Sequence, residues 1–589
     1  MTGTRQASPR TKGGAFLLET RTPEEIFTPE DLTPEHRAIA KTTEEFWNRE
    51  IVPHLDEIRH QNHAAAAKLL KKSAELGLTA VLIPERFGGM EMDLTSMMVV
   101  ASGVSADGSY SAWHGAQTGI GTLPLLLFGT EEQKARYLPK LASAEMIAAY
   151  CLSEPQAGSD ALAVRTRADL SPDGSHYILN GQKMWITNGG FADLYTVFAK
   201  VDGDKFTAFL VERAWPGVST GAEEKKMGIK GSSTTAVFFD NVRVPRENVL
   251  GEIGKGHLIA FNILNLGRLK LGAFTHGGCL DALERSIRYA KERHAFGQPI
   301  AQFGMIRHKL AEMAIRTFVS ESVLYRVIGN IEAQLHPFTW ESPDAAVRML
   351  RAIEEFAIES SYVKILGSET LAYVVDEGVQ IHGGYGFHQD YAIEHAYRDA
   401  RVDRIFEGTN EINRLLATSM LLKRTKRGDL PLAGAVKALE LEIASGTITV
   451  DLSDLIGNAK RAGLIALSAA FQKHGARIEE QQEVTAAITD MLMNAYAIET
   501  ALLRAQKVAQ HGSNRNAENA SDMSRVFASE AMRAMETSGR TVFAACLEGE
   551  TLGPRIELLR QFTDTEPVDT IALRQRIAAR LIEAGRYVV

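Results

Sequence analysis

The sequence of 589 residues contains only three cysteines, Cys151, Cys279 and Cys546, and these lie far apart. This spacing excludes a dense disulfide framework and a recognisable zinc cluster, and it suits a reducing compartment. No run of about 18 apolar residues occurs, so no membrane-spanning helix is predicted. The net charge of −8 disfavours a nucleic-acid-binding protein, because phosphate contacts need clustered Lys and Arg.

The composition is otherwise that of a globular protein, with 45% hydrophobic and 23% charged residues. The chain is too long for one hydrophobic core, so several domains are expected. Residues 1–18 contain Arg5, Arg10 and Lys12 and no acid. A transit peptide can have this composition, but the stretch is short and poorly amphipathic, so we expect a disordered start.

Three Thr-Pro-Glu segments follow, beginning at Thr22, Thr28 and Thr33. Each places Thr at the N-cap of a helix, Pro at its first position and an acid in its first turn. They predict three helix starts and imply no chemistry.

The pattern of the sequence changes along the chain, and it predicts an α+β fold that is mainly α. Apolar residues at helical spacing are followed by β-rich runs with Asn-Gly, Asp-Gly and Pro-Gly turns, and then by long helical stretches. The predicted parts are an N-terminal extension (1–33), an N-terminal helical domain (34–150), a central antiparallel β domain (151–254), a four-helix-bundle domain (255–427) and an additional C-terminal helical domain (428–589).

Glu407 is the candidate catalytic residue. It follows the apolar pair Ile405-Phe406 and precedes Gly408. A carboxylate in such surroundings is poorly solvated, which raises its pKa and makes it a usable general base near neutral pH. The glycine lets a ligand approach the backbone closely. The segment fits equally well an acidic residue at a helix N-terminus, where it meets the helix dipole.

Two further motifs lie around the start of the β-rich region. Residues 151–160 are small or carry hydroxyls, which suits a surface that presents backbone N–H groups to carbonyl or phosphate oxygens, or an ordinary turn. In residues 181–190, Trp185 offers a flat face for a ring system, and Thr187 offers a hydroxyl on the same side of a strand. A buried tryptophan within a sheet is the alternative for Trp185.

Two motifs lie in the second helical region. Arg293 ends a long predicted helix and is a candidate phosphate clamp, although a cation at a helix C-terminus is also normal. Residues 380–387 form a glycine-rich loop between helices. His382 in this loop is expected to be structural, because neither a nucleophile nor a metal partner is nearby in the sequence. No metal site is predicted.

These motifs occur in an order that identifies a family. Residues about 30–425 resemble the acyl-CoA dehydrogenase family of flavoenzymes, in which the glutamate of a Phe/Tyr-Glu-Gly-Thr segment removes the substrate α-proton. Residues 262–268, the pair Phe303-Gly304 and the region after residue 430 resemble the very-long-chain branch, which carries an extra C-terminal helical domain.

The resemblance implies contacts to the flavin of FAD. The peptide groups of Leu152 and Ser153 would contact the flavin ring. Trp185 would stack on it, and the Thr187 hydroxyl would hydrogen-bond near its N5. Ser159 would lie near the FAD pyrophosphate or the pantetheine arm of the substrate.

The remaining roles concern the rest of FAD and the substrate. Arg293 and Phe296 would reach the pyrophosphate and adenine of an FAD held by the neighbouring subunit, and Gln380 and Gly384 would line that same half of the site.

Around Glu407, Thr409 and Glu411 would hold FAD, while Arg268 and Gly408 would contact the acyl-CoA.

Two departures from the family pattern bear on these roles. Some members carry the base on an earlier helix, at the position of Gly267, and a glycine cannot serve as a base, so Glu407 is the only positional candidate. The medium-chain type has a glutamine at the position of Gly304, and the contact that this glutamine makes with FAD is expected to be absent here.

Ala112, Gly115 and Ala116 are small residues on the helix that closes the acyl pocket in shorter-chain relatives, which predicts room for a long acyl tail.

The resemblance implies an FAD-dependent dehydrogenation of acyl-CoA, expected to be long-chain, to trans-2-enoyl-CoA in fatty-acid β-oxidation. An acyl-CoA oxidase and a non-catalytic scaffold with the same fold stay open as alternatives. Expected partners are electron-transfer flavoprotein as the electron acceptor and a second copy in a homodimer. The expected location is the cytoplasm for a bacterial chain, or the mitochondrial matrix for a eukaryotic one. Apolar positions in residues 459–471 and 484–503 favour packing of the C-terminal domain against its own body over peripheral membrane contact.

Overall fold

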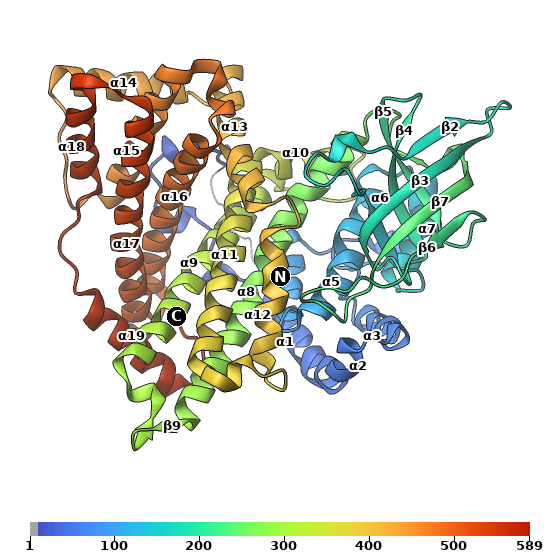
Figure 1. Ribbon diagram of the computed structural model, residues 1–589, viewed down its shortest axis with the longest axis horizontal. Coiled ribbons are helices and arrows are strands. Elements are labelled where there is room, and N and C mark those ends of the chain that lie inside the picture. Colours follow the sequence, from blue (N-terminus) through green and yellow to red (C-terminus); the bar gives the residue numbers. More distant parts are fainter. Residues whose placement is uncertain (1–9) are drawn as a thin grey trace.

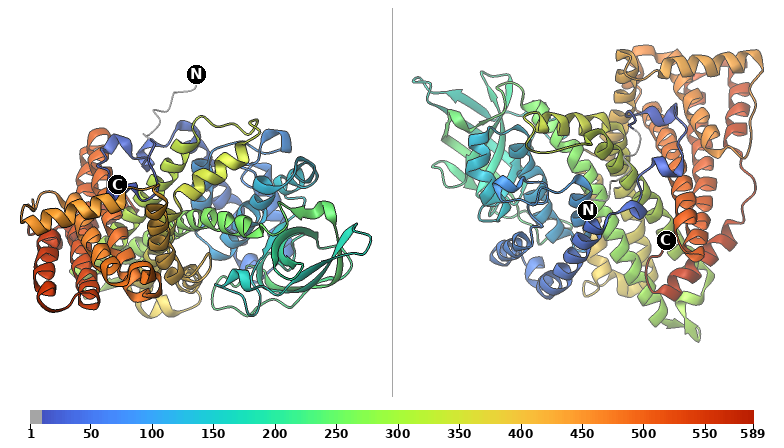
Figure 2. Two further views of the ribbon diagram at one scale, coloured as in Figure 1. Left: turned by 90° about the horizontal axis from the view of Figure 1, so that it is seen from above. Right: turned by 180° about the vertical axis from the view of Figure 1, so that it is seen from behind.

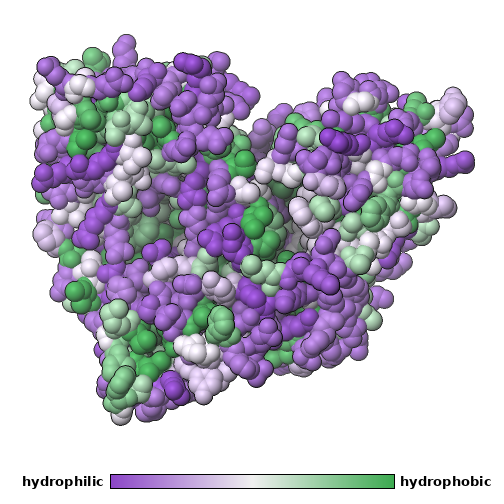
Figure 3. All heavy atoms as spheres, viewed as in Figure 1, coloured by the Kyte–Doolittle hydropathy of each residue, from purple (hydrophilic) through white to green (hydrophobic). Residues whose placement is uncertain are grey.

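The computed structural model describes residues 10–589. Its backbone is a bundle of long helices that has a β domain on one side and the appended helices on the other (Figure 1). The predicted order of a helical domain, a sheet domain and further helical domains is confirmed. The face shown in Figure 3 is mostly hydrophilic, and it is hollowed between the appended helices and the β domain, where apolar residues gather.

The N-terminal extension differs from the expected disordered start. Residues 1–9 lie outside the described residues, but Ala15, Phe16 and Leu17 are buried. The Phe16 ring meets Tyr496 edge-on at 4.8 Å, and the backbone N–H of Gly14 donates to Glu359 at 2.7 Å. The expectation was therefore wrong for residues 10–18, because an apolar triplet there finds a tertiary partner.

The three Thr-Pro-Glu segments do start helices. Thr22 and Thr28 begin single 3-10 turns, Pro23–Glu25 and Pro29–Asp31, and Thr33 begins α1 (Pro34–Phe46). At all three starts the side chain of the third residue reaches back to the backbone N–H of the capping threonine. The predicted helix starts are therefore confirmed.

The N-terminal helical domain supplies one wall of the site through α5. Asp107 caps this helix by accepting hydrogen bonds from the backbone N–H groups of Ser109 and Tyr110, both at 3.1 Å. The main helices of the domain are α1, α3 (His63–Glu75), α4 (Leu94–Gly103), α5 (Gly108–Ala116), α6 (Leu123–Phe128) and α7 (Glu131–Ala142). Beyond α5 the chain continues into a kinked turn of π-helix, Gln117–Gly121.

The β domain is one sheet with the strand order β6-β7-β3-β2-β4-β5-β8, and β1 pairs with β4 outside this order. Most neighbouring strands are antiparallel as predicted, but β1 and β2 both run parallel to β4. The strands are β1 (Ala148–Cys151), β2 (Arg167–Leu170), β3 (His176–Thr187), β4 (Leu194–Val201), β5 (Lys205–Glu212), β6 (Val218–Thr220), β7 (Thr234–Pro245) and β8 (Val249–Leu250).

The central bundle contains α8 (Gly256–Glu292), α9 (Gly304–Leu335), α11 (Ala357–His382) and α13 (Asn410–Arg427), which pack side by side. A short hairpin of β9 (His294–Ala295) and β10 (Gln298–Pro299) joins α8 to α9. Helix α10 (Ala345–Glu355) precedes α11. Helix α12 (Ala392–Ala400) and the 3-10 turn η12 (Arg401–Arg404) lead into the Glu407 segment.

The appended domain consists of α14 (Leu432–Ser445), α15 (Leu455–His474), α16 (Gln482–His511), α17 (Asn514–Cys546), α18 (Leu552–Thr563) and α19 (Thr570–Ala584). Helix α16 packs against both α17 and the bundle helices α9 and α13. The apolar positions of residues 459–471 and 484–503 are mostly buried, so the predicted packing against the body is confirmed. Within residues 10–589, no helix has the length and apolar character needed to cross a membrane.

Candidate active site

Glu407 lies in a sharp turn between η12 and α13. Its backbone φ is 57°, which is unusual for a residue other than glycine, and Gly408 follows at 79°. Thr409 then caps α13 by accepting a hydrogen bond from the N–H of Ile412 at 3.2 Å. The acid at the start of α13 is Glu411, so Glu407 stands outside the helix start. This geometry does not fit Glu407 as the acid of a helix N-terminus, and its catalytic role stays a prediction.

The Glu407 carboxylate is poorly solvated. Its Oε2 is inaccessible to solvent and has no hydrogen-bond partner among the described residues. Burial raises the pKa of Glu407 to about 7, against the opposing effect of Arg268, Lys364 and Lys270. A carboxyl group with this pKa can accept a proton near neutral pH.

Gly267 on α8 makes the space that the carboxylate occupies. A Cβ atom on this residue would lie 2.4 Å from Glu407 Oε2 and 2.9 Å from its Cδ. Any side chain at position 267 would therefore displace the carboxylate of Glu407. Glycine at position 267 and glutamate at position 407 therefore go together for a steric reason.

Hydrogen bonds from Arg268 and Asn413 hold the turn that carries Glu407. Arg268 is only 6% exposed, and its guanidinium donates to the Glu407 carbonyl at 3.4 Å and to Asn265 at 2.7 Å. The side chain of Asn413 donates to the Gly408 carbonyl at 2.8 Å. Arg268 thus fixes the backbone of the base from behind, and the substrate contact expected for it and for Gly408 stays a prediction.

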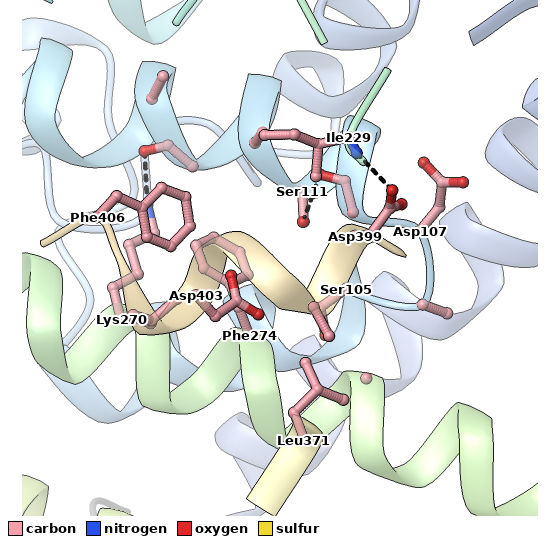
Figure 4. Close-up of a pocket in the computed structure, with 18 of the residues that line it drawn as sticks. Ser105, Asp107, Ser111, Ile229, Lys270, Phe274, Leu371, Asp399, Asp403 and Phe406 are labelled. Carbon is pink, nitrogen blue, oxygen red and sulfur yellow. Dashed lines mark hydrogen bonds between the residues drawn. The ribbon is translucent and has the colours of Figure 1, made fainter. Parts of the chain in front are cut away.

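Glu407 and residues of α5 line a cavity of about 1320 Å³, measured out to where it opens to solvent. Figure 4 shows part of its lining, including Phe406, the neighbour of Glu407 in the chain. The small residues Ala112, Gly115 and Ala116 line the cavity, as the sequence predicts for a roomy pocket. Part of the room at Gly115 is taken by Phe274, because a Cβ atom on Gly115 would lie 2.8 Å from the end of that ring.

The same cavity is lined by charged residues that the sequence does not single out, among them Lys270, Asp403, Asp399 and Asp107, and the pairs Arg59–Asp107 and Arg285–Asp281. Burial raises the pKa of Asp403 to about 8 and that of Asp399 to about 7, and in each case a neighbouring aspartate adds to the shift. Burial lowers the pKa of Lys270 to about 7. One signal was available in the sequence, since 399, 403 and 407 are spaced by four residues, as on one helical face.

The strand β3 presents Trp185 and Thr187. A bulge between Lys183 and Ile186 shifts the register, so that both Lys183 and Ile186 are buried. Trp185 is 59% exposed, which overturns the alternative of a buried tryptophan. Thr187 lines the cavity that contains Glu407. The bulge therefore leaves an indole ring and a hydroxyl on the open side of the strand.

The segment that contains Leu152 and Ser153 is rigidly supported from behind. Lys183 Nζ donates to the Leu152 carbonyl at 3.2 Å and forms a buried ion pair with Glu154 at 2.7 Å. Met184 donates its backbone N–H to the Ser153 carbonyl at 3.0 Å. Ser159 lies further along this segment and is exposed.

A second group of predicted residues lies far from Glu407. Arg293, Gly384 and Tyr289 line a hollow of about 830 Å³ at the far end of α8. Phe296, at the tip of the β9–β10 hairpin, is 95% exposed, and Gln380 is exposed on α11.

Residues 267 and 293 are 26 positions apart on one helix, which is about 39 Å at 1.5 Å per residue. One protomer therefore does not bring the two groups of residues together.

His382 has the structural surroundings expected for it. Its Nδ1 lies 2.7 Å from the Gly378 carbonyl oxygen, and its ring stacks on Tyr289 at 4.1 Å. Burial lowers its pKa, so the ring is neutral at physiological pH.

Comparison with known families accounts for this combination of fold and site. Residues 33–145, 149–242 and 254–422 match the families described as the N-terminal, middle and C-terminal domains of acyl-CoA dehydrogenase, and residues 458–561 match a second family described as an acyl-CoA dehydrogenase C-terminal domain. The chain therefore belongs to the acyl-CoA dehydrogenase family.

Three relatives show how far the likeness extends. A probable acyl-CoA dehydrogenase of Bacillus subtilis is 46% identical over 98% of both chains. The human very long-chain specific acyl-CoA dehydrogenase is 38% identical over 74% of this chain and 70% of its own length. The crystal structure of an acyl-CoA dehydrogenase complexed with FAD from Bacillus anthracis, 44% identical, superposes with a TM-score of 0.96 over 98% of this chain and all of that one.

Proposed function

We propose that this protein is an FAD-dependent acyl-CoA dehydrogenase that converts an acyl-CoA to the trans-2-enoyl-CoA. The observation that carries the proposal is the Glu407 carboxylate. It is poorly solvated, has a pKa of about 7, and lines a cavity of about 1320 Å³.

The residues present fit FAD. The exposed ring of Trp185 and the hydroxyl of Thr187 offer a stacking face and a hydrogen-bonding group beside the Glu407 cavity. Around Gly383 and Gly384 no atom would lie within 4 Å of an added Cβ, so that the backbone is open to a ligand. When bound, FAD supplies the two-electron acceptor that the oxidation needs.

The protein residues supply the proton chemistry. The α-proton of a thioester is weakly acidic, so its removal needs a positioned base and a donor to the thioester oxygen. Glu407 takes the proton, and its own backbone N–H, held by the Arg268-supported turn, serves as a donor to the oxygen. Such a donor contributes about 3 kcal/mol to transition-state stabilisation.

A long acyl chain is the substrate that we propose, within fatty-acid β-oxidation. Two observations support it: the cavity continues past the small residues of α5, and the human relative is named as very long-chain specific. We further propose a cytoplasmic location in a bacterial cell, or the mitochondrial matrix in a eukaryotic one, with electron-transfer flavoprotein as the electron acceptor.

A homodimer is the assembly that we propose. About 39 Å of α8 separates Gly267 from Arg293, so the exposed group of Arg293, Phe296, Gln380 and Gly384 serves the FAD of a second copy. Thr409 and Glu411 at the start of α13 complete the proposed FAD contacts beside the base.

One anaerobic experiment tests the reaction and the base together. Addition of hexadecanoyl-CoA to the purified holoenzyme should bleach the flavin absorbance within seconds, and Glu407→Gln should keep FAD bound but lose the bleaching by at least about 10⁴-fold in rate. Near-normal bleaching in the variant would refute the assignment of Glu407. Release of hydrogen peroxide in air at the rate of turnover would instead identify an oxidase.

A further inference from the structure

The cavity beside Glu407 has a charged lining, and its charged members do not themselves accept the α-proton. Lys270 projects from α8 and Asp403 from the turn before Glu407, and both line the cavity that would receive the acyl chain (Figure 4). Asp399 and Asp107 follow further along it, and Arg59, which also lines the cavity, pairs with Asp107 at 3.3 Å. A binding site for an unsubstituted hydrocarbon chain is expected to be predominantly apolar.

Lys270 is 4% exposed and is incompletely satisfied. Its Nζ donates to the hydroxyl of Thr118 and to the carbonyl of Gly115 at 3.4 Å, and it lies 5.7 Å from the centre of the Phe274 ring. Its pKa is about 7, so below neutral pH the group is mostly an ammonium, which has three donors. Within residues 10–589 it forms no ion pair, so one N–H is left for a ligand in the cavity.

Asp403 complements Lys270 at the same cavity. Burial and the nearby carboxylate of Asp399 raise the pKa of Asp403 to about 8, so at neutral pH it is mostly a neutral carboxylic acid. In that form it both donates and accepts hydrogen bonds. The cavity thus offers an unused N–H donor and a carboxyl group.

An alkyl chain would displace the water molecules at these groups without offering hydrogen bonds in their place. Leaving a buried polar group unsatisfied costs about 1–3 kcal/mol, and more for a charge. A carboxylate on the chain would meet Lys270 favourably, but it would have to lose its own hydration shell and has no hydrogen to donate to the carboxyl oxygens of Asp403. A hydroxyl avoids both penalties, since it accepts a hydrogen bond from an ammonium and donates one to a carboxyl oxygen.

We propose that the cavity selects acyl chains with a hydroxyl group beyond C3, which accepts a hydrogen bond from Lys270 and donates one to Asp403. C2 and C3 carry the hydrogens that are removed, so the hydroxyl stands further along the chain. This inference rests on the proposed function, because it places an acyl-CoA thioester beside Glu407.

The test measures binding without turnover, in the Glu407→Gln holoenzyme. Calorimetry compares hexadecanoyl-CoA with isomers that carry one hydroxyl at successive carbons beyond C3, and with the chain that ends in a carboxylate. At least one hydroxylated isomer should bind about tenfold more tightly than the plain chain, which corresponds to about 1.4 kcal/mol. The carboxylate-ended chain should show no such gain.

Two lysine variants in the same background locate the effect. Lys270→Met should abolish the tenfold gain. Lys226→Met is the control, because Lys226 is half-buried and hydrogen-bonded to Ser232 and Thr234 but lies outside the cavity, and it should keep the gain. FAD content and melting temperature are recorded for each variant. If Lys270→Met does not fold, Asp403→Leu replaces it and should also remove most of the gain.

Plain hexadecanoyl-CoA binding as tightly as every hydroxylated isomer would overturn the inference, and so would a gain that survives Lys270→Met. These outcomes differ from a failure of the proposed function. If the proposed function is wrong, no acyl-CoA bleaches the wild-type flavin. If hexadecanoyl-CoA bleaches the flavin but no hydroxylated isomer binds more tightly, only the hydroxyl preference is refuted.

Discussion

At the scale of single residues, the reactivity of Glu407 results from a balance between burial and nearby cations. Burial favours the neutral acid, while Arg268, Lys364 and Lys270 favour the carboxylate, and the resulting pKa is about 7. The apolar neighbours in the sequence predicted the first effect. The cations come from α8 and α11, which the sequence around Glu407 does not reveal.

This balance predicts the pH dependence of the reaction. The base must be ionised before it accepts a proton, so the rate constant for flavin reduction at low acyl-CoA concentration should rise as pH increases from 5.5 to 8.5, with a midpoint near the pKa of about 7. Stopped-flow absorbance under anaerobic conditions measures it. A rate that is flat or falls over this range would contradict the assigned role.

Gly267 provides a second residue-scale prediction. In Gly267→Ala the new Cβ would stand 2.4 Å from Glu407 Oε2, so the carboxylate must move by about 1 Å, and flavin reduction should slow by about 10²-fold. FAD content should stay unchanged. Gly434→Ala on α14 is the control, because no atom lies within 4 Å of its added Cβ, and its rate should equal that of the wild type.

At the scale of elements, the β-rich runs of the sequence lie within β3, β4, β5 and β7, where alternation and turn residues are local signals. The bulge in β3 and the parallel pairing of β1 and β2 with β4 were not predicted. Both depend on which strands become neighbours, and neither changes the composition of the strand itself. The bulge is nevertheless what exposes Trp185.

The buried pair of Lys183 and Glu154 supports this element. Glu154→Gln would leave the Lys183 ammonium buried without a counter-charge, which should lower the free energy of unfolding by about 3–5 kcal/mol and reduce FAD occupancy. The pair of Lys205 and Asp202 has the same 2.7 Å separation but is exposed, so Asp202→Asn should cost less than about 1 kcal/mol. Chemical denaturation compares the two, and equal losses would contradict the supporting role.

At the scale of the whole molecule, the N-terminal extension fastens the appended domain to the bundle. Seen from behind, its first described residues lie against the appended helices (Figure 2). Arg504 of α16 binds Glu30 of the extension at 2.9 Å and Glu321 of α9 at 2.7 Å. Lys507 binds Asp31 and the Ile26 carbonyl, both at 2.6 Å. Three segments distant in the sequence therefore meet at one buried network.

Breaking this network should loosen the appended domain. Arg504→Leu would leave the buried Glu321 without its arginine, with only His276 and the Tyr587 hydroxyl as partners, and it should destabilise the protein by about 3–5 kcal/mol, with faster amide hydrogen exchange in α16. Arg515→Leu is the matched control, because Arg515 forms a two-bond ion pair with Glu583 in the same domain but at the surface, and it should cost less than about 1 kcal/mol. Unchanged exchange in Arg504→Leu would refute the fastening role.

The sequence by itself predicted the candidate base, Glu407, and determined the local structure, namely the helix starts at the Thr-Pro-Glu segments and the order of the domains. These depend on side-chain type and on spacing over a few residues, which are local properties. Only the tertiary structure decided that Arg293 lies about 39 Å from Gly267, that the first residues after position 9 are packed, and that Lys270 and Asp403 share the cavity of Glu407. Such features depend on which elements meet, and a cavity takes its lining from residues that are far apart in the chain.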